Sequence, residues 1–377
     1  MSADSSHEHS SSPSIGILTV ADKSDQFQGN RSNFIDLIRI GSTYNAKVFV
    51  VTAEDLNLSS TRVHAFCYDQ NNEAWFRQWM PFPQVIYNRI PYRHQEMQPE
   101  VQQKIQACIK QKNLHLFNPG FFNKWSLYKW LSESSETNDY IPITQQLSTS
   151  NDLESLIKLF PIIYLKPVRG KAGKGIMLVE RKSLNPMMPL YKLTIQDTTK
   201  TQNSLHSTSA TLWKKIQKYQ KNEEYIIQQG IDLANYKDRP YDLRALIQKN
   251  SKGEWSFTGI GARLAGASSI TTHVPRGGSI EDPEKMLSQT FGNELAQNIL
   301  KQMKSTALFI AKHIERSSGQ LLGEMSMDLG IDKSGRTWFF EANSKPMKFD
   351  EPHIRKKSLE RIIRFSIFLA KKNKKRR

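Results

Sequence analysis

Apolar runs of strand length alternate with helical spacing in the first third of the chain. Residues 15–20 (IGILTV) and 47–52 (KVFVVT) have the composition of buried strands, and the apolar positions between 34 and 40 favour a helix between them. Further predicted elements are a hairpin of 61–67 with 75–79, a strand at 84–88, a helix at 100–111 and an apolar run at 114–117. Together they predict an α/β domain at 14–118, after a disordered, polar start at 1–13.

A second domain is predicted after an Asn-Pro-Gly turn. Its most informative part is a glycine-rich loop between two strands, at 162–167 and 176–179. The other predicted elements are a helix around 125–131, a loosely ordered Ser/Thr-rich connection at 194–209, a helix at 210–222, strands at 225–229, 242–248, 255–264, 325–331 and 337–342, one long amphipathic helix at 283–315 and a closing helix at 358–370. We therefore expect a domain at 119–370, in which about 160–228 forms a small lid, and a basic tail at 371–377.

Composition places the chain among globular proteins. Hydrophobic residues make up 38% and charged residues 24%, a balance that excludes a disordered chain or a fibrous repeat. The two cysteines, Cys67 and Cys108, allow at most one bridge, which excludes a disulfide-stapled scaffold and favours a reducing compartment. No segment approaches the roughly 18 apolar residues of a membrane span, and the N-terminus lacks the apolar core of a signal peptide. We expect a cytoplasmic protein without a membrane span.

The excess of basic residues predicts an anionic partner. The formal net charge is +17, and six basic residues lie in the last seven positions, so the tail accounts for only part of it. A nucleic-acid reader would interleave basic and aromatic residues on one platform, and the chain has no such pattern. Specific nucleic-acid binding is therefore disfavoured. A nucleotide, an acidic polymer or a charged cell-surface layer stay open as partners.

Three oxygen-bearing side chains near the C-terminal end are candidate metal ligands. If 325–331 and 337–342 pair as a hairpin, Asp328 lies opposite Glu341, and Asn343 joins Glu341 because side chains two apart on a strand share a face. Mg²⁺ prefers one or two carboxylates plus phosphate oxygens, so this set suits a metal beside a nucleotide. The competing interpretation is that these are polar residues of a turn and a strand end.

A loop rich in glycine and lysine is the second candidate site. In 166–176 (KPVRGKAGKGI), three glycines within six residues let backbone N–H groups approach a phosphate, and two lysines add charge. The loop is not a Walker A motif, because Lys174 is followed by Gly175 and a strand follows, not a helix. We expect it to cover phosphates, while a solvated turn is the alternative.

The order of several motifs resembles a known family. After Lys124 come LKPVRGKAGKGI, YIIQQGI, DLRALI, GARLAG, MDLGID and FFEANSKP, and this series is similar to the ATP-grasp superfamily. More specifically, it resembles the YheC/YheD type associated with the endospore coat of Bacillus relatives, over nearly the whole chain. The resemblance implies an α/β and α+β protein with an ATP-grasp fold. Two α+β subdomains would clamp ATP, preceded by an α/β pre-ATP-grasp domain.

The resemblance implies roles for individual residues. Lys124 and Lys166 match the two lysines that reach the nucleotide phosphates and the adenine edge. Arg244, in Asp-Leu-Arg, and Arg263 match basic residues that act on phosphate or the acyl group. The implied ATP-binding residues also include Gly170, Lys171, Gly173, Lys174, Gly175 and Ile176 in the loop and Gln228, Gln229, Gly230 and Ile231 in the hinge, while Asp328, Glu341 and Asn343 would hold Mg²⁺. Surface lysines, solvated arginines and an ordinary buried strand are the competing interpretations. One departure is His273, which stands where many relatives carry an Asn before a Gly-Gly pair.

These observations favour an enzyme over two other classes of protein. The first hypothesis is a Mg-ATP-dependent carboxylate–amine ligase that forms an acyl phosphate, with an unknown carboxylate and an unknown nucleophile as substrates, one of them acidic or polymeric. The second is a catalytically silent, nucleotide-binding component of the spore coat. The third, a nucleic-acid binder, lacks a binding platform. ATP and Mg²⁺ are the expected cofactors, and coat or cortex components are candidate partners.

Overall fold

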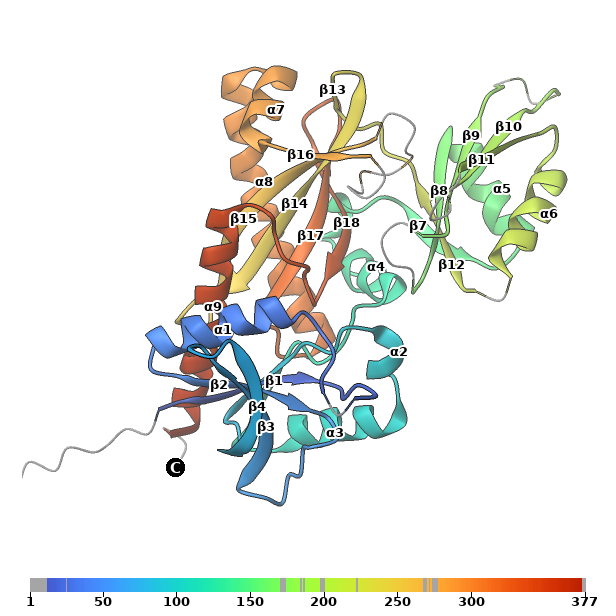
Figure 1. Cartoon of the computed structure of the whole chain (residues 1–377). Helices are drawn as coiled ribbons and strands as arrows, with labels where there is room; N and C mark the ends of the chain where they lie inside the picture. The colour runs from blue at the N-terminus through green and yellow to red at the C-terminus, as the bar shows by residue number, and fades with distance from the viewer. Residues whose placement is uncertain are drawn as a thin grey trace, which may run out of the picture.

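Three sheets make up the framework of the protein (Figure 1). The computed structural model describes residues 12–24, 26–169, 174–183, 185, 187–196, 201–221, 223–266, 270, 272 and 277–374. We name the sheets the N-terminal sheet (β1 to β6), the lid sheet (β7 to β12) and the core sheet (β13 to β18). In Figure 1 the lid sheet stands to one side, while the N-terminal and core sheets lie one below the other.

The N-terminal sheet has the strand order β4-β3-β2-β1-β5-β6, with β1 parallel to β2 and β5. Its elements are β1 (Ser14–Thr19), α1 (Arg31–Thr43), β2 (Lys47–Thr52), β3 (Arg62–Asp69), β4 (Ala74–Pro81), β5 (Val85–Asn88), α2 (Arg93–Glu96), α3 (Pro99–Lys110) and β6 (His115–Phe117). The predicted β-α-β opening and the hairpin of β3 with β4 are both confirmed. A short connection joins β5 to α2, and Asn88 at the end of β5 and Glu96 at the end of α2 both contact Lys345, which follows β18.

The lid sheet has the order β11-β10-β9-β8-β12-β7, and its apolar core includes residues of α5 and α6. Its elements are β7 (Thr144–Leu147), α5 (Ser150–Leu159), β8 (Ile162–Pro167), β9 (Ile176–Arg181), β10 (Tyr191–Gln196), β11 (Thr201–His206), α6 (Ser209–Gln220) and β12 (Tyr225–Gln229). The prediction of a loose connection at 194–209 is wrong, because β10 and β11 pair antiparallel there. Strand β11 is a polar edge strand without buried residues, so it carries no hydrophobic alternation. The sheet also includes β7, which precedes the lid boundary suggested near residue 160.

The core sheet has the order β16-β15-β14-β17-β18, with β13 paired to β14. Its elements are α4 (Lys124–Ser132), the short 3₁₀ helix η1 (Asn138–Tyr140), β13 (Asn235–Tyr236), β14 (Arg239–Lys249), β15 (Trp255–Leu264), β16 (Ser279–Glu281), α7 (Pro283–Phe291), α8 (Asn293–Ser318), β17 (Glu324–Ile331) and β18 (Thr337–Asn343). One face buries alternate apolar residues against α4, α7 and α8. The single helix predicted at 283–315 is wrong, since Gly292 at φ +80° ends α7 and precedes α8.

The last helix, α9 (Pro352–Lys374), connects the core sheet with the N-terminal sheet (Figure 1). It is longer at both ends than the predicted helix at 358–370, and residues 371–374 of the predicted basic tail belong to it. Leu359, Ile362 and Phe365 of α9 are buried in the same apolar cluster as Ile15 and Val50 of the N-terminal sheet. The helix therefore completes a core that the first domain opens. No helix among the described residues combines the length and apolarity that a membrane crossing requires.

Candidate functional site

Three predicted site residues form one row across the polar face of the core sheet. Arg244 on β14 is the register partner of Asp328 on β17, and Asp328 is the register partner of Glu341 on β18. The predicted pairing of Asp328 with Glu341 is thus confirmed. Asn343 follows Glu341 by two positions and pairs with Ser326, so it lies in the adjacent row. The neighbouring positions on these strands point into the apolar core, which fixes the polar residues on the opposite face.

The next row along this face pairs Asp242 with Arg263, and Asp328 of the first row joins them in a buried ionic cluster. Arg263 Nε and Nη2 donate to the two carboxylate oxygens of Asp242 at 2.8 and 2.6 Å, and Nη2 also lies 2.9 Å from Asp328 Oδ2. Thr272 Oγ1 donates to Asp242 Oδ2 at 2.5 Å. Burial alone would lower the pKa of Arg263, but Asp328 and Asp242 more than offset it and the pKa is raised. Arg263 is therefore a permanent cation that holds two carboxylates in place.

The two predicted nucleotide lysines lie close to this polar face. Lys124 begins α4, and its Nζ lies 2.7 Å from Glu341 Oε1. Lys166 on β8 donates from Nζ to Gln228 Oε1 at 2.5 Å, and its ammonium lies 5.6 Å from the ring centroid of Phe340. Burial lowers the pKa of Lys166 to about 8, the nearby Lys124 charge adds to the shift, and the carboxylates of the site oppose it. The structure thus brings a lid lysine and a core lysine together.

The predicted hinge and loop residues differ in how close they come to the polar face. Gln228 accepts from Lys166, while the N–H groups of Gln229 and Gly230 donate to the carbonyls of Ile143 and Ile162, both at 2.8 Å. The backbone amides of Gln229 and Gly230 are therefore already engaged, and Ile231 follows the strand end. Of the loop, Lys174 is exposed, Gly175 adopts φ +78° with its carbonyl accepting from Tyr225, and Ile176 begins β9. Gly170, Lys171, Gly173 and His273 lie outside the described residues.

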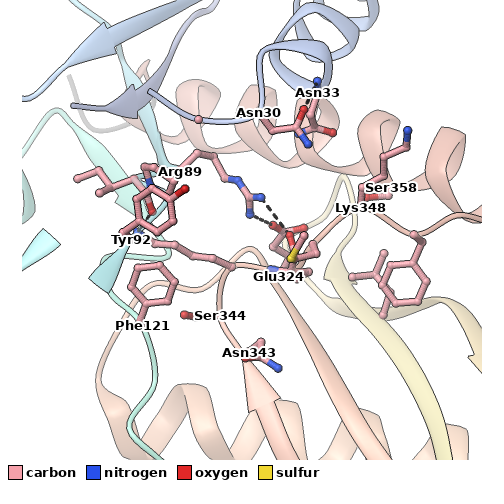
Figure 2. Close-up of a pocket in the computed structure, with 18 of the residues that line it drawn as sticks. Asn30, Asn33, Arg89, Tyr92, Phe121, Glu324, Asn343, Ser344, Lys348 and Ser358 are labelled. Atoms are coloured by element: carbon pink, nitrogen blue, oxygen red, sulfur yellow. Dashed lines mark hydrogen bonds and ion pairs between the residues drawn. The ribbon is translucent and has the colours of Figure 1, made fainter. Parts of the chain in front are cut away.

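A large cavity adjoins the polar face. Its volume is about 1560 Å³, and it is lined by residues of the N-terminal domain, the core sheet and α9 and by Val168 and Arg169, which follow β8. The site residues on its wall are Lys124, Arg244, Arg263, Asp328, Glu341 and Asn343. Figure 2 shows Arg89 and Tyr92 on one side, Lys348 and Ser358 on the opposite side and Asn343 with Ser344 below. Lys166 and Gln228 do not line it, but Gln228 lines a smaller pocket that shares Lys124 and Glu341 with the cavity.

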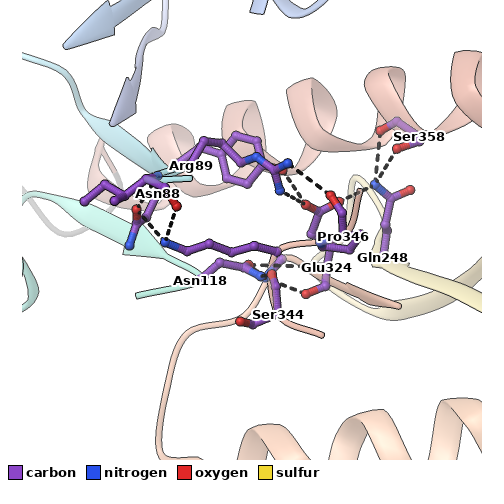
Figure 3. A network of polar contacts seen from close by, with 12 residues as sticks. Asn88, Arg89, Asn118, Gln248, Glu324, Ser344, Pro346 and Ser358 are labelled. Carbon is purple, nitrogen blue, oxygen red and sulfur yellow. Dashed lines mark hydrogen bonds and ion pairs between the residues drawn. The ribbon is translucent and has the colours of Figure 1, made fainter. Parts of the chain in front are cut away.

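A buried polar network joins the N-terminal sheet to the core sheet beside this cavity (Figure 3). Arg89 Nη1 lies 3.3 Å from Glu324 Oε1, and Gln248 Nε2 donates to Glu324 Oε2 at 3.1 Å. Lys345 pairs with Glu96 and also donates to Asn88 Oδ1 at 3.0 Å. Burial lowers the pKa of Lys345 to about 8, and Glu96 opposes that shift. Sequence reasoning missed these residues, because pairs so distant in the chain leave no local pattern.

The donor set fits a hard cation. Asp328 and Glu341 supply carboxylate oxygens and Asn343 a neutral amide oxygen, the ligand types that Mg²⁺ takes together with phosphate oxygens. Among the described residues no three His, Cys, Asp or Glu side chains gather into a metal-binding group. A metal held here would thus depend on oxygens that a ligand brings. The residues present fit a metal that arrives with a nucleotide.

Comparison with known proteins agrees with this geometry. Residues 113–369 match the family model described as YheC/D like ATP-grasp. The endospore coat-associated protein YheD of Bacillus subtilis is 27% identical over 97% of this chain and 81% of its own length, and its companion YheC is 24% identical over 82% and 84%. The structure of D-alanine–D-alanine ligase from Bacillus anthracis complexed with ATP superposes with a TM-score of 0.53 at 11% identity, covering 97% of this chain and all of the ligase. The predicted ATP-grasp fold is therefore confirmed, and the chain belongs to the YheC/D-like ATP-grasp family.

Proposed function

We propose that the protein is a Mg-ATP-dependent ligase. A carboxylate oxygen of one substrate attacks the γ-phosphorus of ATP and ADP leaves. An amine or a related nucleophile of the second substrate then attacks the acyl carbon, loses its proton, and inorganic phosphate leaves. The net result is a new amide-type bond at the expense of one ATP. The family and the fold support ATP-dependent ligation, and the residues of the polar face support this particular order of steps.

The observation that carries the proposal is the alternation of charges on the cavity wall. Glu341 is held by Lys124, and Asp328 by Arg263, so each carboxylate has a cation beside it. Such a surface offers oxygens for a metal and ammonium groups for phosphates within one small area. A sheet with a structural role alone would carry apolar residues at these positions, since burying charges is costly even when they are paired.

Each residue of the site has a part in this proposal. Asp328, Glu341 and Asn343 would hold Mg²⁺, which neutralises charge on the phosphates when bound. Lys124 and Lys166 bind phosphate oxygens and orient them toward the cavity. Arg244 faces the cavity and has no carboxylate within ion-pair distance among the described residues, so it is suited to bind the reacting carboxylate. Arg263 positions Asp328 and Asp242.

Association with the spore coat is the second part of the proposal. Two curated relatives carry the name endospore coat-associated protein, and the surplus of positive charge suits an acidic layer. One of the two substrates would then be an acidic or polymeric component that the protein meets in this layer. A chain that binds Mg-ATP but never hydrolyses it, with or without coat extract, would instead be a silent structural component.

Ligand-induced stabilisation tests the nucleotide site. The melting temperature of the full chain should rise with Mg-ATP, because a ligand that binds only the folded state stabilises it by mass action. Lys166→Ala should remove most of that rise. Lys158→Ala is the matched control, since this lid lysine is 75% exposed and lies on α5. An unchanged rise in the Lys166 variant would place the nucleotide elsewhere.

A further inference from the structure

The cavity wall carries more positive charge than its own carboxylates neutralise. Six of the lining cations have a carboxylate partner: Arg31 with Asp22, Arg89 with Glu324, Lys124 with Glu341, Arg263 with Asp242 and Asp328, Lys345 with Glu96, and Arg355 with Asp36. Four others, Arg93, Arg169, Arg244 and Lys348, have no carboxylate within 4.0 Å among the described residues. This surplus points to an anionic ligand that extends beyond the reacting group.

Arg93 is held by neutral groups and so keeps its charge. It lies at the start of α2, and its Nη2 donates to the carbonyl of Phe122 at 2.6 Å. Its guanidinium carbon also lies 5.4 Å from the ring centroid of Phe121. A guanidinium fixed by carbonyls and an aromatic face is oriented without being neutralised, which is the arrangement of a preorganised anion site.

Arg169 approaches the same part of the cavity from the lid. It follows β8, is exposed and lines the cavity together with Arg93. Burial lowers the pKa of Arg93, and the positive charge of Arg169 lowers it further, while Glu96 and Glu341 oppose the shift. An arginine of α2 and an arginine of the lid thus repel each other across one space, and an anion between them would relieve that repulsion.

Arg244 marks a second, separate position. Its guanidinium carbon lies 5.2 Å from the ring centroid of Phe349, and its Nε is buried without a hydrogen-bond partner among the described residues. The nearby cation Lys348 is followed closely by Asp350 and Glu351, which also line the cavity and offset its charge. Net positive charge is therefore concentrated at Arg244 on the core sheet and at the Arg93–Arg169 pair.

The size and the apolar rim of the cavity favour a chain-like ligand over a small anion. A volume of about 1560 Å³ exceeds the roughly 300–1,000 Å³ of small-molecule sites. Large apolar side chains stay exposed on its wall, with Tyr92 49%, Met97 58% and Met347 62% exposed. A small, fully hydrated polyanion would not contact them, whereas a peptide backbone with methylene-bearing side chains would.

Resting on the ligase function proposed above, we propose that the substrate whose carboxylate is phosphorylated is an acidic peptide that binds through two carboxylates. One is the reacting carboxylate, held at Arg244 beside the row of Asp328 and Glu341. The other binds between Arg93 and Arg169. The spacing of these two positions makes the site selective for acidic groups on a common chain, and a lone carboxylate fills only half of it.

Fluorescence anisotropy with labelled peptides tests this inference on the full chain. The probes are capped tetraglutamate and capped tetraglutamine, each with Mg²⁺ and a non-hydrolysable ATP analogue. Tetraglutamate should bind saturably and tetraglutamine should not. Arg169→Gln and Arg93→Gln should each weaken tetraglutamate binding about tenfold, the loss expected for one charged hydrogen-bonding partner. Arg316→Gln is the matched control, because this exposed arginine on α8 lies outside the cavity.

The outcomes separate the two proposals. Arg169 is exposed and makes no hydrogen bond or ion pair with the described residues. Its variant therefore keeps the test valid even if the Arg93 variant fails to fold. Equal binding of both peptides, or unchanged tetraglutamate affinity in Arg169→Gln, would overturn the inference. Inorganic tripolyphosphate binding more tightly than tetraglutamate would also overturn it in favour of a phosphorylated ligand. A wild-type chain that binds Mg-ATP but no peptide contradicts this inference alone, whereas one that ignores Mg-ATP contradicts the proposed function.

Discussion

The ammonium group of Lys124 lies 2.7 Å from a carboxylate oxygen of Glu341. The lysine begins α4 and the glutamate is near the end of β18, so the contact joins two elements that converge at the cavity. Glu341 is also a candidate metal ligand, and a cation on that oxygen competes with a metal for it. The Glu341 carboxylate thus has two alternative positive partners, Lys124 and a metal ion. A metal that binds Glu341 must either displace the Lys124 ammonium or share the carboxylate with it.

Replacing Glu341 by Gln should leave the fold intact and weaken metal-dependent nucleotide binding. The change removes one charge at nearly constant volume, and one carboxylate is a large part of a Mg²⁺ site. The Mg-ATP-induced rise in melting temperature should fall, while the rise with ATP in EDTA stays the same. Glu133→Gln is the control, since this glutamate is exposed and its ion-pair partner is the equally exposed Lys129. A Gln variant that unfolds yet hydrolyses ATP normally per folded molecule would make Glu341 structural.

Nucleotide affinity should fall as pH rises through 8. The pKa of Lys166 is lowered to about 8, chiefly by burial, so the free protein carries a charged Lys166 below that pH and a neutral one above it. Only the charged form attracts phosphate, so the dissociation constant of Mg-ATP should rise about tenfold between pH 7 and pH 9. Titration calorimetry across this range would show the trend. Lys166→Arg should flatten the profile, and a wild-type profile without a rise would contradict the role of Lys166.

Asp242→Ala should destabilise the core sheet. Arg263 is buried with a raised pKa, so it cannot lose its charge when one of its two carboxylates is removed. Breaking a buried ion pair from one side costs about 3 kcal/mol. Urea unfolding should show that loss in the free energy of unfolding. Asp232→Ala removes a carboxylate that is 74% exposed and should change little, and equal stability of both variants would mean that the Arg263 cluster is not stabilising.

Neutralising the basic C-terminal end should weaken attachment to spores without affecting nucleotide binding. Lys375, Arg376 and Arg377 are changed to Gln together, which spares α9 and every candidate site residue. Less variant than wild type should sediment with isolated spores at low salt. The difference should shrink above 0.5 M salt, where the screening length falls to about 4 Å. Equal sedimentation at low salt would exclude anchoring by this end.

The pairing of Asp328 with Glu341 could be predicted because a hairpin is local. A short turn and a period of two place the two carboxylates on one face before any tertiary contact is known. The clamp of Arg263 by Asp242 could not be predicted in this way, since it depends on how β14 and β15 align. The Arg93–Arg169 pair was beyond sequence reasoning altogether, because Arg93 lies on α2 of the N-terminal domain and Arg169 follows β8 of the lid.

Element boundaries failed where the hydrophobic pattern was ambiguous. The apolar spacing continues across Gly292, yet its positive φ breaks the helix there, and a glycine followed by an asparagine was a readable stop signal. Strand β11 offered no such signal, because an edge strand with polar residues on both faces looks like a linker. Tertiary pairing, not local propensity, makes it a strand.

Helix α9 determines when the N-terminal half can complete its folding. The apolar face of the N-terminal sheet that holds Ile15 and Val50 is covered in part by Ile362 and Phe365, close to the C-terminal end. During synthesis these residues emerge long after the first sheet, so that sheet leaves the ribosome with this face uncovered. The lid sheet has its own apolar core and needs no such partner. The middle of the chain can therefore fold before α9 has been made, whereas the N-terminal half waits for α9 and depends on protection from aggregation until then.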